Sequence, residues 1–496
     1  MRMRAHSFFA ALRAHVATKR AVVDASAQFS YSSLLRQALA LRDRLPSGAN
    51  VGVFLQPTAA LVPALLAVWA SGSTAVPLSP LFPAAALSPL LDVIDPAAIV
   101  TSQGLRHALP PFTNAVELVE NAQPSEREID YPAVCDELAP LMPSTALIFF
   151  TSGTTGHPKG VVWTQHMLMY QLQTLSKAWK WSSADRILNV LPLHHIHGMV
   201  NVVLSAIFNG ATLEMHSAFD AHSVWRSILG EGEFQPPTVF MAVPAVYKKL
   251  ILYYNAASPA DQNAMRQAAA SLRLYVCGSA SLSKSDFDAW QHISGHTILE
   301  RYGMTETGMT LSNLYEDRHH GLLGCPLPGV QVRVEGEHQT GQLLVKGPGV
   351  FQQYYRMPDV TERSFTPDGW FKTGDVVSID EPTGYYKLLG RESSDIIKTG
   401  GYKVSALEIE DVIRDCHGVV DCCVLGVPDD VLGQRIAAAI IVDDTKDVLN
   451  SVRQRVEQFL PKYKMPRQYH VVDDFPRNVL GKVQKQMLRL RLGLAS

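Results

Sequence analysis

Residues 151–160 read Thr151-Ser152-Gly153-Thr154-Thr155-Gly156-His157-Pro158-Lys159-Gly160, and they follow the apolar residues 146–150. Glycines let a backbone approach a polyphosphate closely, hydroxyls and amides donate hydrogen bonds to its oxygens, and a lysine adds positive charge. The P-loop of nucleoside triphosphatases needs Gly before Lys and Ser or Thr after it, whereas here Pro158 precedes Lys159 and Gly160 follows. The segment therefore predicts a strand and a phosphate-binding loop of another class; the alternative is a Ser/Thr/Gly-rich surface loop.

On both sides of this loop, short apolar stretches alternate with amphipathic ones. Residues 50–55 and 98–101 have the composition of strands, and residues 58–70 and 84–93 that of helices. Such alternation predicts α/β layers around largely parallel sheets. We therefore expect the fold class to be α/β.

Beyond Gly321 the pattern changes to short strands with tight turns, which predicts an antiparallel, barrel-like part. The last hundred residues return to an α+β alternation. A polar stretch at residues 392–394 predicts the boundary between a large N-terminal domain of layered α/β sheets with a small barrel, residues 1–392, and a small mobile C-terminal domain, residues 393–496. The strands expected after Gly321 are 330–334, 341–345, 376–380, 385–389, 419–427 and 436–442, and the helices are 406–414 and 448–460.

The longest apolar run and the basic N-terminus bear on the compartment. Residues 61–78 are interrupted by Pro63 and by residues 71–74, so they predict a buried helix, a turn and a strand, with no membrane span. Residues 6–17 are amphipathic and predict the first helix of the fold, which leaves little room for a leader. We expect a cytoplasmic protein, with the mitochondrial matrix as the alternative because basic residues precede the first acid, Asp24.

Composition excludes several classes of protein. The chain has 496 residues, of which 47% are hydrophobic and 18% charged, and this is ordinary for a globular enzyme of more than one domain. A net charge of −2 does not favour a nucleic-acid partner. The six cysteines are scattered without a CxxC pair, which argues against a zinc site and a disulfide framework and favours a reducing compartment.

Six further motifs follow the loop in order, and together they resemble the adenylate-forming superfamily of acyl-CoA synthetases, peptide-synthetase adenylation domains and luciferases. The resemblance covers nearly the whole chain and implies that ATP, Mg²⁺ and CoA are bound. The motifs are Gly278-Ser279-Ala280, Tyr302-Gly303-Met304-Thr305-Glu306, Thr373-Gly374-Asp375, Gly390-Arg391, Gly400-Gly401-Tyr402-Lys403 and Gly481-Lys482-Val483-Gln484-Lys485.

The resemblance assigns a role to each motif. Lys482, Glu306, Thr305 and His195 are the expected catalytic residues, and Thr151 and Glu306 the expected ligands of Mg²⁺. The remaining nucleotide and CoA contacts are expected from the loop and the later motifs. They are Thr151, Ser152, Gly153, Thr154, Thr155, Gly156, Lys159, Gly278, Ser279, Ala280, Tyr302, Gly303, Met304, Asp375, Arg391 and Lys403.

These residue types suit the chemistry of acyl-adenylate formation. An aromatic ring at Tyr302 can stack on adenine, and the Asp375 carboxylate can accept hydrogen bonds from ribose hydroxyls. Glu306 offers a hard oxygen ligand to Mg²⁺. Lys482 can stabilise the charge that develops when a carboxylate attacks the α-phosphate. Lys485, like Lys398 and Lys403, is either a phosphate or CoA contact or part of a solvated basic face.

The acid is indicated by a different set of residues. Arg301 directly precedes Tyr302, and a buried arginine there wants an anionic partner such as a second carboxylate on the substrate. The alternative is an internal pair with Glu300 or another acid. Residues 299–306 and 325–330 resemble the malonate-activating branch, which implies malonate as substrate and methylmalonate as a tolerated one. The expected substrate contacts are Arg301, His195, His197 and Lys249.

Three other functions compete with this hypothesis. A CoA ligase for a medium-chain fatty or aromatic acid would have an apolar pocket with no use for Arg301. An enzyme that loads a carrier protein would need an acid for a substrate ammonium, and no carrier-protein domain is evident in the chain. A non-catalytic nucleotide-binding protein would be expected to lack Lys482 or Glu306, and both are present.

Overall fold

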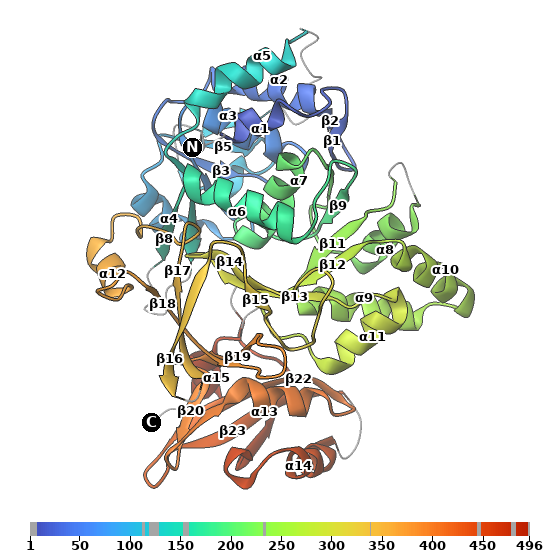
Figure 1. Cartoon of the computed structure of the whole chain (residues 1–496), viewed down its shortest axis with the longest axis vertical. Helices are drawn as coiled ribbons and strands as arrows, with labels where there is room; N and C mark the ends of the chain where they lie inside the picture. Colours follow the sequence, from blue (N-terminus) through green and yellow to red (C-terminus); the bar gives the residue numbers. More distant parts are fainter. Residues whose placement is uncertain are drawn as a thin grey trace.

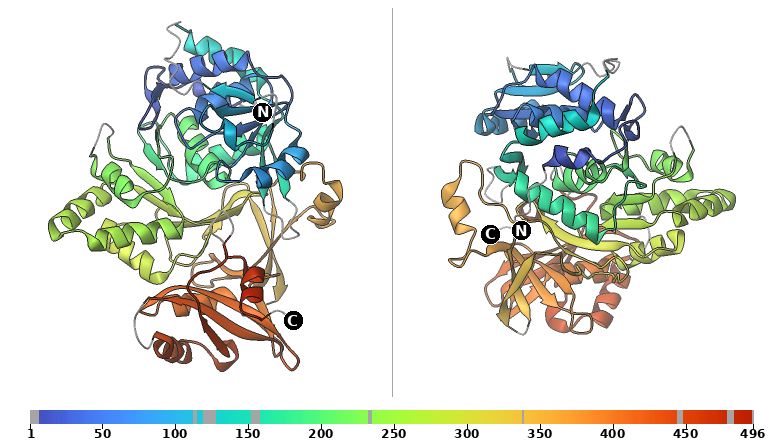
Figure 2. Two further views of the ribbon diagram at one scale, coloured as in Figure 1. Left: turned by 180° about the vertical axis from the view of Figure 1, so that it is seen from behind. Right: turned by 45° about the horizontal axis from the view of Figure 1, so that its top comes forward.

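The computed structural model describes residues 7–111, 115–118, 128–151, 158–231, 235–337, 339–443, 448–477 and 483–494. Figure 1 shows a large upper lobe, blue to yellow, and a small lower lobe in orange and red, which follows strand β19 (Tyr386–Arg391). Figure 2 shows the same two lobes from behind and from above.

Two large sheets form the framework of the large lobe. Their strands, within the described residues, are β1 (Arg20–Val23), β2 (Gln28–Ser30), β3 (Asn50–Phe54), β4 (Thr74–Pro77), β5 (Ala98–Ser102), β6 (Ala115–Leu118), β7 (Thr145–Thr151), β8 (Lys159–Thr164), β9 (Arg186–Asn189), β10 (Thr212–Met215), β11 (Val239–Ala242), β12 (Leu274–Cys277), β13 (Leu299–Met304), β14 (Gly308–Ser312) and β15 (Cys325–Pro326). One sheet has the order β15-β14-β13-β12-β11-β9-β10-β1-β2, and the other the order β6-β5-β3-β4-β7-β8. Pairing is parallel inside both sheets and antiparallel towards their edges, at β1–β2, β7–β8, β13–β14 and β14–β15.

Helices cover both faces of these sheets. They are α1 (Phe8–Leu12), α2 (Tyr31–Arg42), α3 (Leu61–Ala70), α4 (Ala84–Ile94), α5 (Tyr131–Leu138), α6 (Gln165–Ala178), the π-helix η3 (His197–Leu204), α7 (Ser205–Phe208), α8 (Ala221–Leu229), α9 (Pro244–Ala256), α10 (Pro259–Ala270), α11 (Lys284–Ser294) and the outlying α12 (Pro358–Arg363), with short 3₁₀ turns η1 (Arg106–Ala108) and η2 (Ala139–Leu141).

Side chains that alternate along the inner strands join these layers. On β3, Val51 and Val53 enter the main core, which also contains Trp69 of α3, while Phe54 packs with Leu90 of α4 on the other face. Successive residues of a strand point to opposite faces, so a strand covered on both sides is apolar throughout. This explains why the parallel strands were visible in the sequence as continuous apolar runs.

Two smaller sheets complete the molecule. An antiparallel sheet is formed by β16 (Gln331–Glu337), β17 (Thr340–Lys346), β18 (Phe371–Ile379) and β19 in that order. The small lobe contains β20 (Ile396–Thr399), β21 (Tyr402–Ser405), β22 (Val419–Asp429), β23 (Gly433–Val442) and β24 (Gln468–Val471), with α13 (Ala406–Arg414), α14 (Val448–Phe459), α15 (Lys485–Arg491) and the 3₁₀ turn η4 (Lys462–Lys464). The buried Ile409 and Val452 pack α13 and α14 on one face of its sheet, and Leu488 packs α15 on the other.

The α/β class, with a large layered part and a small α+β part, is confirmed, and the expected strands and helices are present with shifted ends. The first helix is shorter than expected, because the chain leaves it at Arg13 and His15 Nε2 lies 3.1 Å from the carbonyl oxygens of Ile207 and Phe208. The apolar run at 61–78 is a helix, a turn and strand β4, as predicted.

In the part of the chain that the structure describes, no helix is long and apolar enough to cross a bilayer, and the six cysteines form no disulfide.

Candidate active site

The phosphate-loop motif lies between two paired strands. Thr151 ends β7, Lys159 opens β8, and the two residues face each other in the antiparallel register. The Thr151 hydroxyl donates to the Lys159 carbonyl oxygen at 3.4 Å. Ser152, Gly153, Thr154, Thr155 and Gly156 lie outside the described residues, as does Lys482 in the small lobe. The structure therefore places the two ends of the loop.

Glu306 sits in the tight turn between β13 and β14. Its backbone is fixed by Phe351, whose N–H donates to the Glu306 carbonyl oxygen at 2.7 Å. The neighbouring Thr305 carbonyl accepts from Trp163 Nε1 at 2.8 Å. The Glu306 carboxylate is buried and accepts from the Tyr354 hydroxyl, 2.9 Å from Oε1. Burial raises the pKa of Glu306, and the Tyr354 hydrogen bond opposes that shift.

Lys159 and Glu306 meet at Tyr354. The Lys159 ammonium lies 5.3 Å from the centroid of the Tyr354 ring, within cation–π range. Arg391 and Lys159 both exert an electrostatic pull on the Glu306 carboxylate. The end of the phosphate loop, the expected cation ligand and the expected ribose region are thus neighbours in space, although they are far apart in the sequence.

Asp375 lies on β18 and is held by two partners. The Tyr302 hydroxyl donates to Oδ2 at 2.5 Å, and Arg391 Nε lies 2.9 Å from Oδ1. Arg391 also donates from Nη1 to the carbonyl oxygen of Thr373 at 2.9 Å. These contacts bring together three expected nucleotide residues from β13, β18 and β19. Asp375 and Tyr302 are buried, and the negative charges around Arg391, first that of Asp375, raise the pKa of its guanidinium against the effect of burial.

The expected adenine segment leaves the end of β12. Gly278 is buried, while Ser279 and Ala280 are exposed. Ser279 has a φ of 73°, in the left-handed region that a serine rarely adopts. Backbone strain of this kind is concentrated at functional sites because the surrounding structure must maintain it. A methyl group at position 278 would lie 2.5 Å from Arg301 Nη1, so only glycine fits against this guanidinium.

Arg301 is buried, and none of the acidic residues that the structure describes forms an ion pair with it. It is 3% exposed, and its Nε and Nη2 have no hydrogen-bond partner among the described residues. Burial lowers the pKa of Arg301 to about 10, and the nearby Cys277 and Tyr247 oppose the shift. Glu300, the sequence neighbour, instead accepts from the Gly321 N–H at 2.7 Å. The internal pair between Arg301 and Glu300, which the sequence left open, is absent.

Three histidines approach the same region from the segment after β9. The rings of His194 and His195 are 3.9 Å apart. His197 opens the π-helix η3, is buried, and has no partner for Nδ1 or Nε2 within the described chain. Burial depresses its pKa well below the usual value, and the charges of Arg301 and His195 lower it further, so the ring is neutral. Buried polar atoms without protein partners require a ligand or water.

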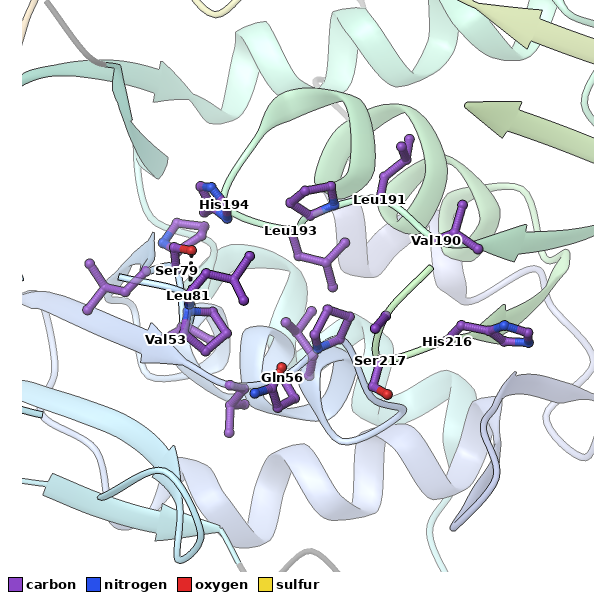
Figure 3. Close-up of a pocket in the computed structure, with 18 of the residues that line it drawn as sticks. Val53, Gln56, Ser79, Leu81, Val190, Leu191, Leu193, His194, His216 and Ser217 are labelled. Atoms are coloured by element: carbon purple, nitrogen blue, oxygen red, sulfur yellow. Dashed lines mark hydrogen bonds between the residues drawn. The ribbon is translucent and has the colours of Figure 1, made fainter. Parts of the chain in front are cut away.

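A cavity of about 260 Å³ opens beside His194 (Figure 3). Leu61, Val190 and Leu193 contribute to its largely apolar lining, while Gln56, Ser79 and Ser217 are among its polar members. Phe219 lines it as well, and the Lys249 ammonium lies 5.6 Å from the Phe219 ring centroid. Lys249 itself is exposed on α9, so the structure does not bring it into the buried cluster of Arg301 and His197. Its substrate role stays a prediction.

The basic residues of the small lobe differ in their environments. Lys403 is exposed on β21, beside Tyr402, whose ring stacks on Tyr463 with centroids 4.3 Å apart. Lys485 is neither solvated nor available to a phosphate. Its ammonium lies 2.7 Å from Asp395 Oδ1 and 3.3 Å from Glu410 Oε1. The expectation of a phosphate, CoA or solvent-facing role for Lys485 is therefore wrong, because two buried carboxylates need its charge.

The residues present fit a magnesium ion carried by a polyphosphate. In the described parts of the chain, no three His, Cys, Asp or Glu side chains gather to hold a metal by themselves. Mg²⁺ commonly keeps several waters and takes one or two carboxylates together with substrate phosphates. Glu306 supplies a single buried carboxylate, and Thr151 adds a hydroxyl at the start of the loop.

Sequence reasoning missed Tyr354. Its contacts depend on the pairing of its segment with strand β8, which lies almost two hundred residues earlier in the chain. The only local signal is its position shortly before Thr373 and Asp375.

Known proteins share this architecture. The profile described as AMP-binding enzyme matches residues 8–355, and that described as AMP-binding enzyme C-terminal domain matches residues 408–482. The chain is 38% identical over 469 residues to the mitochondrial malonate–CoA ligase ACSF3 of Homo sapiens, covering 87% of this chain and 81% of that protein. The crystal structure of ATP-bound MatB from Rhodopseudomonas palustris matches with a TM-score of 0.82 at 30% identity, covering 99% of both chains. A ternary product complex of malonyl-CoA ligase with methylmalonyl-CoA and AMP matches with a TM-score of 0.68 at 32% identity, covering 95% of this chain and 100% of the other.

Proposed function

This chain belongs to the AMP-binding enzyme family and is an AMP-forming acid:CoA ligase, and from that premise we propose that the acid it activates is malonate, with methylmalonate tolerated. The relatives that match over most of the chain include a malonate–CoA ligase and a malonyl-CoA ligase with methylmalonyl-CoA bound. The observation that carries the proposal is the buried guanidinium of Arg301, whose Nε and Nη2 have no partner in the described chain.

An unpaired buried charge costs several kcal/mol, so a protein keeps one only where a partner arrives. A carboxylate can accept two parallel hydrogen bonds from a guanidinium, and such bidentate pairs are among the strongest in proteins. Malonate has a second carboxylate, one methylene away from the first. The neutral His197, which feels the charge of Arg301, adds a hydrogen-bonding ring next to that guanidinium.

The reaction proceeds in two steps. One malonate carboxylate attacks the α-phosphate of ATP, the bond to the β-phosphate breaks, and pyrophosphate leaves. The CoA thiolate then attacks the acyl carbon and displaces AMP, which gives the thioester. We propose Lys482 for the charge that develops in the first step, and Thr151–Gly156 with Lys159 for the phosphates. Mg²⁺ bound by Glu306 would neutralise phosphate charge.

Different residues are proposed to bind the nucleotide and CoA. We propose that adenine lies between Tyr302-Gly303-Met304 and Gly278-Ser279-Ala280, with the ribose at Asp375 and Arg391. For CoA, the exposed rings of Tyr402 and Tyr463 stack beside the exposed Lys403. Aromatic rings next to a mobile positive charge suit a nucleotide that carries phosphates.

An acid panel with wild type and Arg301→Ala tests the substrate. In wild type, CoA-dependent AMP release should be fastest with malonate. In the variant, kcat/KM for malonate should fall by roughly 100-fold or more, because a site built to pair a charged group loses that pair. Acetate and propionate should be used as well as before or better.

The matched control is Arg333→Ala, which removes a half-buried arginine of β16 that, unlike Arg301, pairs with a carboxylate, that of Asp368 at 2.9 Å. It should leave the acid preference unchanged. An equal loss for every acid in Arg301→Ala would contradict the assignment to malonate and leave the ligase activity in place.

One feature favours a second candidate, a CoA ligase for a medium-chain fatty or aromatic acid. The cavity beside His194 is largely apolar and has a volume of about 260 Å³. Hexanoate and benzoate therefore belong in the panel. Use of either acid in preference to malonate, together with its loss in the cavity-filling variant Leu193→Trp, would support this candidate.

A further inference from the structure

The segment around Tyr354 lies between the two parts of the site that handle phosphate. Tyr354 forms an antiparallel bridge with Val161 of β8, and the Tyr355 N–H donates to the Gly160 carbonyl at 2.7 Å. On its other side, the Phe351 N–H donates to the Glu306 carbonyl at 2.7 Å. Backbone pairing therefore ties one short segment both to the outgoing strand of the phosphate loop and to the turn that bears Glu306.

From this position the side chain of Tyr354 contacts both Glu306 and Lys159. Its hydroxyl donates to Glu306 Oε1 at 2.9 Å, and its ring lies 5.3 Å below the Lys159 ammonium. The residue is 6% exposed, and its ring packs edge-on against Phe351 at 4.7 Å. A side chain packed in this way has one orientation, and a residue that locks the rotamer of a site group fixes the direction in which that group acts.

We propose that Tyr354 is a positioning residue that aims the Glu306 carboxylate at the divalent cation of ATP and seats Lys159 beside the same phosphates. This proposal rests on the proposed function, in which Glu306 is the cation ligand. The hydroxyl fixes one carboxylate oxygen and the ring contacts the lysine, so a single side chain holds both groups.

Tyr354→Phe separates the two contacts, since it removes the hydroxyl and keeps the ring. Binding of Mn²⁺ in the presence of ATP, without acid or CoA, is followed by the electron paramagnetic resonance spectrum of the ion, which reports its coordination directly. The dissociation constant of Mn²⁺–ATP from the enzyme should rise about tenfold, as expected when a hydrogen bond to a charged group is lost. Binding of AMP without metal should stay at the wild-type value.

Tyr355→Phe is the matched control. The Tyr355 hydroxyl accepts from Asn50 Nδ2 at 2.8 Å, so this variant also loses one phenol hydrogen bond in the adjacent residue. Both variants should lose similar thermal stability, whereas only Tyr354→Phe should change the Mn²⁺ spectrum. Wild-type Mn²⁺–ATP binding in Tyr354→Phe, or equal weakening in Tyr355→Phe, overturns the proposal.

Glu306→Gln distinguishes failure of this inference from failure of the proposed function. If Glu306→Gln binds Mn²⁺–ATP as wild type does, Glu306 is not the ligand and the premise falls. If Glu306→Gln weakens binding and Tyr354→Phe does not, the premise stands and the positioning role is wrong.

Discussion

At the scale of single residues, Glu300 and Arg301 are neighbours on β13 whose side chains contact different parts of the structure. Consecutive side chains of a strand point to opposite faces, so the two charges cannot pair. Glu300 turns towards the Gly321 N–H, and Arg301 lies against Gly278. The sequence did not reveal on which face of the sheet each side chain lies, because the residues on either side of the pair are apolar.

Glu300 predicts a pH dependence of stability. Burial raises its pKa from 4.5 to about 8. The pKa of Glu300 is therefore higher in the folded state than in the unfolded state. Its contribution to the free energy of unfolding is fully present below about pH 4.5 and is lost as the pH rises through about 8. The Glu300 contribution should therefore make the wild-type melting temperature fall between about pH 4.5 and 8, and Glu300→Gln should flatten this fall. Glu316→Gln, at an exposed glutamate, is the control and should keep the wild-type slope.

Asp375→Asn tests the proposed ribose site. The neutral amide loses the ion pair with Arg391 and one acceptor for ribose hydroxyls, so the dissociation constant of AMP, measured by calorimetry, should rise at least about tenfold. Asp368→Asn removes an ion pair with Arg333 on the exposed edge of the same sheet and serves as the control. Unchanged AMP binding in Asp375→Asn would place the ribose elsewhere.

At the scale of elements, regular strands and helices were predicted well, and irregular ones were not. Strand β7 and helix α13 follow from apolar composition and period. The π-helix η3 was not predicted, because its eight residues, polar and apolar alike, are all buried, so no exposed face gives the sequence a helical period. Its first residue, His197, was named from the resemblance, whereas the widened turn that carries it came only from the structure.

Lys485 shows how burial reverses a reading based on charge. A lysine in a basic C-terminal segment suggests solvent or phosphate, and nothing local reveals that Asp395 and Glu410 face it. The Lys485 side chain is 16% exposed, and the two carboxylates hold its pKa above the usual range against the effect of burial. The α15 helix is thereby tied to the turn that follows β19.

Lys485→Met should destabilise the small lobe by about 3–5 kcal/mol, because it leaves two buried carboxylates without their shared cation. Urea unfolding followed by hydrogen exchange of β22 and β23 measures the loss. Asp395→Asn in the same chain should recover part of it, since the pair is coupled. Lys462→Met, at an exposed lysine, should have no comparable effect. A small effect for Lys485→Met would mean that water replaces the ion pair.

At the scale of the whole molecule, hydrogen bonds between described residues join the two lobes, among them that from the Ser405 hydroxyl to the Leu389 carbonyl oxygen at 2.5 Å. The Ser281 hydroxyl, directly after the expected adenine segment, donates to Asp411 Oδ1 on α13 at 3.3 Å. The connection runs through the turn at residues 392–395, where the Arg391 N–H donates to Asp395 Oδ2 at 3.0 Å. We propose residues 1–392 and 393–496 as two domains that rotate about this turn between the half-reactions, with Ser394 the first position to test.

A disulfide tests the rotation. Ser281→Cys with Asp411→Cys, oxidised, should fix the present arrangement and stop one half-reaction while the other continues. Pyrophosphate exchange into ATP reports the first step, and transfer from isolated malonyl-AMP to CoA reports the second. Reduction should restore both. Wild-type rates for both steps in the oxidised protein would show that the lobes need not move.

The carboxylate of Asp375 already accepts a hydrogen bond from the Tyr302 hydroxyl and pairs with the Arg391 guanidinium. The hydroxyls of an incoming nucleotide sugar would compete with these two donors for the carboxylate oxygens. The gain from each ribose hydroxyl is then only the difference between the new bond and what the existing bonds lose. Deoxy-ATP should consequently bind almost as tightly as ATP, because the hydrogen bond that it lacks contributes little net free energy.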